Sequence, residues 1–318
     1  GMFMNTAPEQ SVAVLPFVNM SGDTDNEYFS DGLTETLLHV LAQLPGLRVA
    51  ARTSSFAFKG QNTDIGEIAA TLGVAHLLEG SVQKADDRVR VTAQLIRAED
   101  GFHVWSQSYT RPLEDIFAIQ DEIAADVARA LGGSLLDDPQ SEAHVVSTQD
   151  LDAYDSYLKG LEQQAIYSYT SLDLAERHFK QALVNDPDFT EARLALARNH
   201  ILKYETGLID ADTLQARVQL LIEQVREKDP ENARARVFEL TVRLRTSTAG
   251  TPEEMRAIVE DLLAQLERVL SFDYSYEPAR ALRAEIERHP PVLEVEADET
   301  AVDDRAVRRG SWFAPAQS

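Results

Sequence analysis

The stretch Val12–Thr36, VAVLPFVNMSGDTDNEYFSDGLTET, decides how the fold begins. Its first apolar residues are continuous rather than alternating, which is typical of a short buried strand, and we predict that strand over Val12–Phe17. A polar loop rich in turn-forming residues follows at Asn19–Asn26. From Phe29 onward the apolar residues recur at helical spacing. The stretch therefore predicts a strand, a loop and a helix, which is how an α/β domain starts.

The segments that follow extend this pattern. Ser30 or Asp31 is predicted to cap the first helix, and Pro45-Gly46 is predicted to end it. A second short strand is predicted at Leu47–Ala51. The next segment, Arg52–Gly60, is polar and aromatic and has no clear period, so no regular element is predicted there.

A second helix and a run of three strands complete the first half. Asp64 is predicted to cap this helix, and Gly73 is predicted to end it as a left-handed cap residue. The resulting order, β-α-β-α-β-β-β-α, predicts an α/β domain with a mixed sheet, in which the parallel part precedes an antiparallel meander. The three strands and the last helix are predicted at Ala75–Lys84, Arg88–Arg97, Phe102–Thr110 and Leu113–Leu131.

Successive blocks of the first half resemble one known family. They read AVLPFVNMSGDTDNEYFSDGLTETL, RTSSFAFKG, LGVAHLLEGSV, RVRVTAQLI and GFHVWSQSYTRPLEDIFAIQDEIA. In this order they resemble the TolB amino-terminal-like (FlgO-like) domain, which occurs beside tetratricopeptide repeats in bacterial adenylate cyclases and winged-helix regulators. The resemblance implies the fold and carries no established chemistry. The sequence shows neither a cyclase catalytic domain nor a DNA-binding winged helix, so it implies neither activity.

The second half has helical periodicity throughout. Small residues recur where paired helices would touch, and Pro187 and Pro230 close two helix pairs. This pattern resembles tetratricopeptide repeats, although the two prolines lie further apart than the ~34 residues of the standard repeat. We therefore expect a degenerate, all-helical array. The predicted ranges are 11–132 for the α/β domain, 133–149 for a linker, 150–289 for the helical repeats and 290–318 for an acidic, irregular tail.

Composition excludes several classes of partner. The chain has 318 residues, enough for two domains, and carries 30 basic and 53 acidic residues, a formal net charge of −23. Such a charge disfavours nucleic acid and anionic membrane surfaces. There are no cysteines, which removes disulfides and thiolate chemistry. No apolar run approaches the ~18–20 residues of a membrane helix, so no membrane insertion is expected. The sequence leaves three questions open: whether the compartment is cytoplasmic or periplasmic, whether an anchor lies upstream, and whether the chain forms a homodimer.

Candidate ligand-binding residues gather in two segments of the first half. Asp31 and Glu35 are four residues apart on one helix face, where they could act as paired carboxylates or simply complement the helix dipole. The cations and hydroxyls of Arg52–Lys59 could bind an anion, although the sequence lacks a glycine-rich phosphate loop. No histidine pair has metal-ligand spacing, and no metal or cofactor is expected. The candidates are Asn19, Ser21, Asp31, Glu35, Arg52, Ser54, Ser55 and Lys59.

The sequence favours a binding protein over an enzyme. No catalytic constellation accompanies the helical repeats, so the leading prediction is a non-catalytic scaffold or signalling module that binds a protein or peptide. We expect Tyr157, Arg193 and Asn199 to lie exposed on the inner helix faces and to contact that partner. The alternative is a small-ligand sensor with a pocket near residues 19–26 and 52–59.

Overall fold

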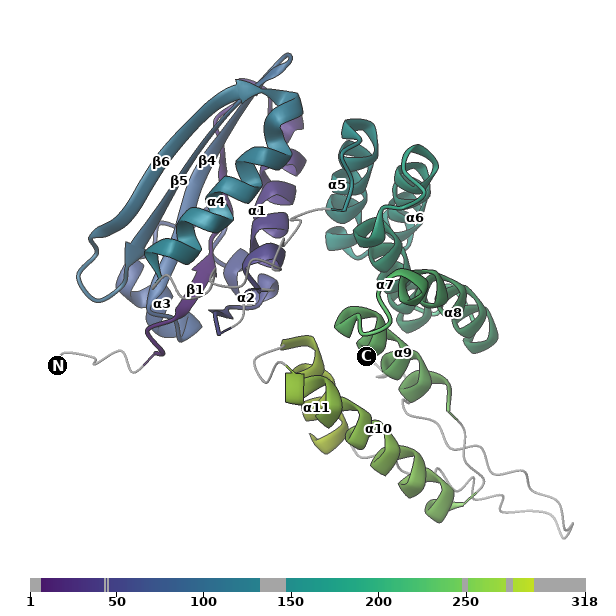
Figure 1. Ribbon diagram of the computed structural model, residues 1–318. Helices are drawn as coiled ribbons and strands as arrows, with labels where there is room; N and C mark the ends of the chain where they lie inside the picture. The colour runs from purple at the N-terminus through teal and green to yellow at the C-terminus, as the bar shows by residue number, and fades with distance from the viewer. Residues whose placement is uncertain are drawn as a thin grey trace, which may run out of the picture. The chain divides into compact units, whose positions relative to one another are not determined.

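The computed structural model describes residues 7–42, 44, 46–131, 147–247, 251–272 and 277–288 (Figure 1). The chain divides into two compact units. The sheet unit comprises Gly1–Ile166 with Arg177–Glu191, and the helical unit comprises Tyr167–Glu176 with Ala192–Ser318. The predicted combination of an α/β domain with a mixed sheet and an all-helical region is confirmed. The predicted tail and most of the predicted linker lie outside the described residues.

The sheet unit is built on one mixed sheet with strand order β3-β1-β4-β5-β6, and β2 pairs with β4 beside β1. β1 runs parallel to β3 and β4, whereas β4, β5 and β6 form an antiparallel meander. The predicted succession of a parallel and an antiparallel part is therefore confirmed. The strands are β1 Ser11–Val14, β2 Val18–Asn19, β3 Arg48–Val49, β4 His76–Ala85, β5 Arg88–Arg97 and β6 His103–Pro112.

Helices cover the sheet because its residues alternate in polarity. In β5, Val89 and Val91 are buried while Arg88 and Arg90 are exposed, as the sequence alternation predicts. The helices α1 (Glu27–Ala42) and α4 (Ile116–Ala130) lie against the sheet (Figure 1). All four residues of β1 are buried, and Ala13, together with Leu15 just after the strand, packs against α3 (Ile65–Leu72).

The predicted strand Val12–Phe17 is shorter than expected. It ends at Val14. The Leu15 amide still donates a 2.8 Å hydrogen bond to Leu78 O of β4, and the next strand begins at Val18. Pro16 has no amide hydrogen for a strand ladder. The amide of Phe17 donates a 2.9 Å hydrogen bond to the Thr34 hydroxyl of α1 instead of to a neighbouring strand. The break thus ties the first strand to the helix that follows it.

Two predictions about helix boundaries are wrong. α1 begins at Glu27, so Ser30 and Asp31 lie inside the helix rather than at its cap. The loop before it tightens into a 3₁₀ turn whose cap is Asp23. The segment from Arg52 contains a short helix, α2 (Arg52–Phe56), where no regular element was predicted. The helix predicted between Asp64 and Gly73 is confirmed as α3, since Asp64 caps it and Gly73 ends it with φ 66°.

The helix α5 (Leu151–Ile166) packs in the sheet unit, although it falls within the range predicted for the repeats. Tyr154 is almost fully buried there, and its hydroxyl accepts a 2.6 Å hydrogen bond from Gln120 Nε2 of α4. The Thr36 hydroxyl of α1 lies 3.2 Å from the same oxygen. α1 and α5 approach closely at Gly32, where an added Cβ would lie 2.4 Å from Leu158 Cδ2.

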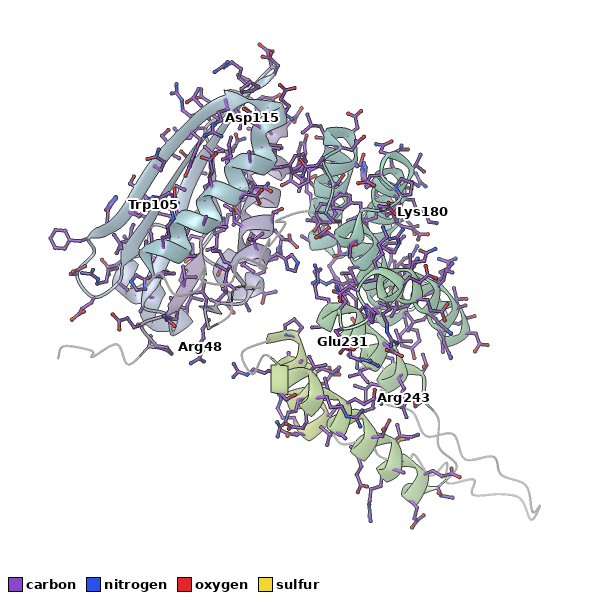
Figure 2. All side chains as sticks on the ribbon, viewed as in Figure 1. Arg48, Trp105, Asp115, Lys180, Glu231 and Arg243 are labelled. Atoms are coloured by element: carbon purple, nitrogen blue, oxygen red, sulfur yellow. The ribbon has the colours of Figure 1, made fainter. Side chains whose placement is uncertain are left out.

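The helical unit is held together by an apolar core and by ion pairs. Its core includes Leu240, Leu262 and Leu282 from three different helices. Arg243 of α9, labelled in Figure 2, pairs with Asp261 of α10. The helices after α5 are α6 Tyr169–Asn185, which is divided between the two units, α7 Thr190–Glu205, α8 Ala211–Lys228, α9 Ala233–Thr246, α10 Pro252–Phe272 and α11 Glu277–Arg288.

One arginine connects three helices of the helical unit. Arg245 of α9 is only 9% exposed, and its guanidinium lies 3.3 Å from Glu205 Oε1 and 3.0 Å from Glu285 Oε1. These carboxylates belong to α7 and α11. Because one cation is shared by two acidic partners, the ends of α7, α9 and α11 are held near one another.

We predict that Tyr154→Phe lowers the free energy of unfolding by about 1–2 kcal/mol, because the buried Gln120 amide loses its acceptor. Replacing both partners with apolar residues, Tyr154→Phe with Gln120→Leu, should recover part of this loss. Urea unfolding followed by circular dichroism measures both effects. Tyr169→Phe is the control, because Tyr169 is 63% exposed. Equal losses in the single and double variants would contradict the prediction.

Candidate functional site

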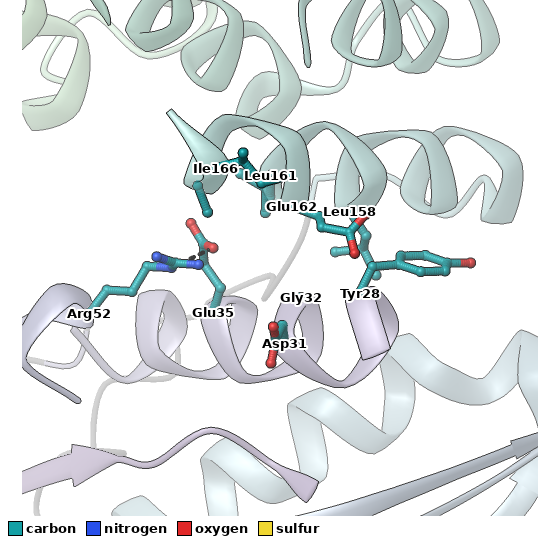
Figure 3. Close-up of a pocket in the computed structure, with 10 residues that line it drawn as sticks. Tyr28, Asp31, Gly32, Glu35, Arg52, Leu158, Leu161, Glu162 and Ile166 are labelled. Atoms are coloured by element: carbon teal, nitrogen blue, oxygen red, sulfur yellow. Dashed lines mark hydrogen bonds and ion pairs between the residues drawn. The ribbon is translucent and has the colours of Figure 1, made fainter. Parts of the chain in front are cut away.

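A cavity of about 230 Å³ lies in the sheet unit between α1, α2 and α5 (Figure 3). Its polar wall combines one guanidinium with several carboxylates and a phenol. In Figure 3, Arg52 and Glu35 approach from one side, and α5 forms the opposite side. The polar lining residues are Tyr28, Asp31, Glu35, Arg52 and Glu162.

The remaining wall of the cavity is apolar and belongs mainly to α5. Leu158 and Leu161 are buried, whereas Ile166 is 58% exposed at the cavity's edge. Gly32 completes this wall on α1, where its missing side chain lets Leu158 contact the helix backbone. The cavity therefore offers an aliphatic surface opposite charged groups.

Arg52 is fixed by two contacts. Its Nε donates a 2.8 Å hydrogen bond to Glu35 Oε2, and its guanidinium carbon lies 4.1 Å from the centre of the Phe56 ring. A guanidinium carries five N–H donors in a planar fork. The terminal nitrogens of Arg52 have no hydrogen-bond acceptor among the described residues, so they remain available to a ligand.

Asp31 is paired with a lysine next to the cavity. Lys59 Nζ lies 2.6 Å from Asp31 Oδ2 and 2.8 Å from Glu27 Oε1. Burial raises the pKa of Asp31, and the Lys59 ammonium offsets this only in part. Burial alone would lower the pKa of Lys59, but its hydrogen bonds with the two carboxylates outweigh burial and raise it.

Tyr28 joins the cavity to a hydrogen-bonded group on α5. Its hydroxyl donates a 2.5 Å hydrogen bond to Asp155 Oδ1, and Lys159 Nζ lies 2.7 Å from Asp155 Oδ2. Burial raises the pKa of Asp155, but the hydrogen bonds from Lys159 and Tyr28 outweigh burial, so this pKa lies below its usual value. The carboxylate of Asp155 thus helps to hold α5 against α1.

The structure brings together only some of the predicted ligand-binding residues. Asp31, Glu35 and Arg52 line the cavity, and Lys59 contacts it through Asp31. The other four do not line it. Ser54 is exposed on α2, and the buried Ser55 hydroxyl has no hydrogen-bond partner within the described part of the chain.

Asn19 and Ser21 instead shape the turn after β2. Asn19 accepts a hydrogen bond from the Ser21 amide and donates one to Asp23 O. The Ser21 hydroxyl accepts a 2.9 Å hydrogen bond from the Lys84 amide of β4. Both side chains are therefore engaged in local structure, away from the cavity lining.

The contribution of α5 to the cavity was not predicted from the sequence. Leu161, Glu162 and Ile166 line it, yet they lie more than a hundred residues beyond α1 in the chain. The helical period of α5 indicated an apolar face but not the surface that this face covers. Gly32, inside the predicted first helix, was the only signal that another element approaches there.

The predicted exposure of the three partner-binding residues is wrong, because all three are buried. The ring of Tyr157 packs 4.9 Å from that of Phe189, centre to centre. Asn199 Nδ2 donates a 2.9 Å hydrogen bond to the Leu172 carbonyl. Arg193 is 9% exposed. These side chains support the helices and do not form an open binding face.

A second hollow lies within the helical unit. It is a groove of about 540 Å³ formed by α7, α9 and α11. Its lining is mostly apolar and includes four charged side chains. The apolar lining residues are Ile201, Leu202, Val237, Phe238, Pro278, Ala281 and Leu282, and the polar ones are Arg198, Glu205, Thr241, Glu285 and Arg288.

The histidines, aspartates and glutamates of the described residues form no group of three or more that could hold a metal ion. Within the same residues, no helix combines the length and the apolar character needed to cross a membrane.

The chain is similar in sequence to part of one curated protein. This protein is named "Putative adenylate cyclase 3" and comes from Rhizobium meliloti (strain 1021). The two sequences are 41% identical over 189 residues, which is 59% of this chain and 32% of the relative. The chain thus spans about a third of the length of the curated relative that it matches. No family model matches the sequence.

Solved structures similar to the chain include three bacterial proteins. TolB from Acinetobacter baumannii is 16% identical, with 40% of this chain and 30% of that chain covered and a TM-score of 0.29. Lipoprotein GNA1162 from Neisseria meningitidis is 18% identical, with 40% and 99% covered and a TM-score of 0.30. The LpoB C-terminal domain from Salmonella enterica is 19% identical, with 33% and 84% covered and a TM-score of 0.28.

We predict that Asp155→Asn destabilises the protein at pH 7 by about 0.5–1 kcal/mol, a small value because solvent screens this half-buried pair. The folded-state pKa of Asp155 is lowered, so its contribution is present above the unfolded-state pKa of about 3.9. It is lost as the pH falls through the lower folded-state pKa.

Urea unfolding of the wild type and the variant, from pH 7 down to the lowest pH at which both are folded, checks this prediction. The difference between them should shrink below pH about 4. Asp87→Asn, in the exposed turn between β4 and β5, is the control and should change stability by less than about 0.5 kcal/mol. A difference for Asp155→Asn that does not depend on pH would contradict the assignment.

Proposed function

We propose that this chain is a non-catalytic binding module that takes up a peptide segment of a partner protein in the groove of its helical unit. The observation that carries the proposal is the groove itself, which combines a mostly apolar lining with charged side chains from α7 and α11. Grooves with an apolar lining and nearby charges are suited to amphipathic peptides.

Features of the helices support a tetratricopeptide-like architecture. Gly160 of α5 faces Phe179 of α6, and an added Cβ at Gly160 would lie 2.4 Å from the Phe179 ring. Close helix contact at a small residue beside an aromatic one is the pattern that the sequence suggested. The groove is lined by alternate helices of the chain, as expected where every second helix faces a shared concave surface.

The charges of the groove favour a peptide that carries carboxylates. Glu205 and Glu285 share Arg245, so their charges are partly compensated within the protein. Arg288, which is exposed, adds a positive charge to the same lining. The expected occupant therefore has apolar side chains that contact the apolar lining residues and an acidic side chain that reaches Arg288.

The sequence match is compatible with a role inside a longer protein. The matched relative carries the name of an adenylate cyclase, and the match spans only about a third of it. We propose that the chain contributes partner binding in such a protein and that any catalysis resides elsewhere. A small-ligand site in the sheet unit is the second candidate function, favoured because Asp31, Glu35 and Arg52 meet at one cavity.

The groove predicts charge-selective peptide binding. Fluorescently labelled peptides of leucine and glutamate should bind the full chain, whereas matching peptides of leucine and lysine should bind at least about tenfold more weakly. Ala281→Glu places a carboxylate in the groove at an exposed position and should weaken the binding of the acidic peptide by about tenfold or more. Fluorescence anisotropy measures both effects.

Ala264→Glu is the matched control, because Ala264 is also an exposed helical alanine of the helical unit but does not line the groove. It should leave peptide binding unchanged. Absence of binding by either peptide would reject the proposed function. Equal weakening by both substitutions would show that the peptide binds outside the groove.

A further inference from the structure

We propose that the cavity between α1, α2 and α5 binds a small zwitterion with a short aliphatic side chain, such as a free aliphatic amino acid. This inference gives a ligand class to the second candidate function. It concerns the sheet unit, so it stands or fails separately from peptide binding in the groove. Three features of the cavity carry it: a guanidinium with unused donors, an excess of carboxylates and an aliphatic wall.

The guanidinium supplies a site for a carboxylate. Glu35 uses only the Nε of Arg52, and the Phe56 ring lies against the guanidinium face. The edge that carries the terminal nitrogens is left for a ligand, and Arg52 lines the cavity. Arginine binds carboxylates in a two-pronged geometry, which gives orientation as well as attraction.

The carboxylates supply a site for an ammonium group. Asp31 is compensated by Lys59, and Glu35 by Arg52. Glu162 has no ion-pair partner among the described residues, and its nearest hydrogen bond is a long one, 3.4 Å, from the amide of Gln163. The cavity therefore holds one uncompensated negative charge opposite the guanidinium, which favours a cationic group at that end of the ligand.

The apolar wall and the volume limit the rest of the ligand. Leu158, Leu161 and Ile166 form an aliphatic surface beside both charged sites. At about 230 Å³ the cavity is smaller than the about 300–1,000 Å³ typical of drug-sized ligands. A ligand of this size has room for an ammonium, a carboxylate and a short branched chain.

A ligand with only one charge would satisfy only part of the cavity. A simple amine would leave the terminal nitrogens of Arg52 without an acceptor, and a simple carboxylate would face Glu162 without a compensating cation. Binding of a zwitterion pairs both groups at once. The proposal therefore requires that both charges of the ligand contribute to affinity.

Three compounds with one carbon skeleton test this requirement: leucine, 3-methylbutylamine, which lacks the carboxylate, and 4-methylpentanoate, which lacks the ammonium. Isothermal titration of the full chain should show leucine binding at least about tenfold more tightly than either of the others. If 3-methylbutylamine binds as tightly as leucine, the cavity is a plain cation site and the proposal is wrong. If none of the three binds, the proposal is also wrong.

Two substitutions assign the ends of the ligand. Glu162→Gln, at an exposed position, should weaken the binding of leucine by about tenfold. It should leave the affinity for 4-methylpentanoate unchanged or slightly raise it. Arg52→Lys keeps the charge but loses the planar fork of the guanidinium. It should weaken the binding of leucine and leave the affinity for 3-methylbutylamine unchanged. Glu67→Gln, at an exposed position of α3 outside the cavity, is the control.

The substitutions remain decisive if one of them unfolds the chain. Arg52 also supports α2 through Glu35 and Phe56, so its variant is first compared with the wild type by thermal unfolding. Glu162 makes no ion pair among the described residues and should be replaceable without loss of fold. Leucine affinity that is unchanged in Glu162→Gln, or reduced equally in Glu67→Gln, would overturn the proposed binding mode.

Discussion

The cavity of the sheet unit depends on the hydrogen bonds of the buried Tyr154 hydroxyl. A phenol oxygen buried this completely needs polar partners, and Gln120 and Thr36 supply them from α4 and α1. These contacts set the position of α5 along both helices. Gly32 then allows Leu158 to rest against α1. Half of the cavity lining belongs to α5, so the cavity exists only because α5 is held in this place.

Much of the fold could be predicted because its signals are local. The alternation in Arg88–Arg97 reports which face of the strand is buried. Asp64 caps α3 by accepting a hydrogen bond with its side chain, and Gly73 ends the helix with a left-handed backbone. The start of α1 could not be predicted in this way. Its first turn continues a 3₁₀ turn, so polar residues further on, such as Ser30, had the pattern of a cap although they are buried within the helix.

The candidate site was predictable only on one side. Asp31, Glu35 and Arg52 lie close in sequence, and helical spacing together with residue type identified them. The opposite wall comes from a distant helix whose packing partner no local pattern specifies. The same limit explains the error at Asn199, since a polar residue on a helix gives no sign in the sequence that its amide serves a buried carbonyl of the helix before it.

Arg245 has a consequence for how the helical unit responds to its surroundings. A single guanidinium holds the ends of α7, α9 and α11 through two carboxylates, so the width of the groove and its charge are not independent properties. Glu205 and Glu285 line the groove, whereas Arg245 is not among its lining residues. A movement that separated the ends of these helices would therefore remove the compensation of the two carboxylates and leave the groove more negative.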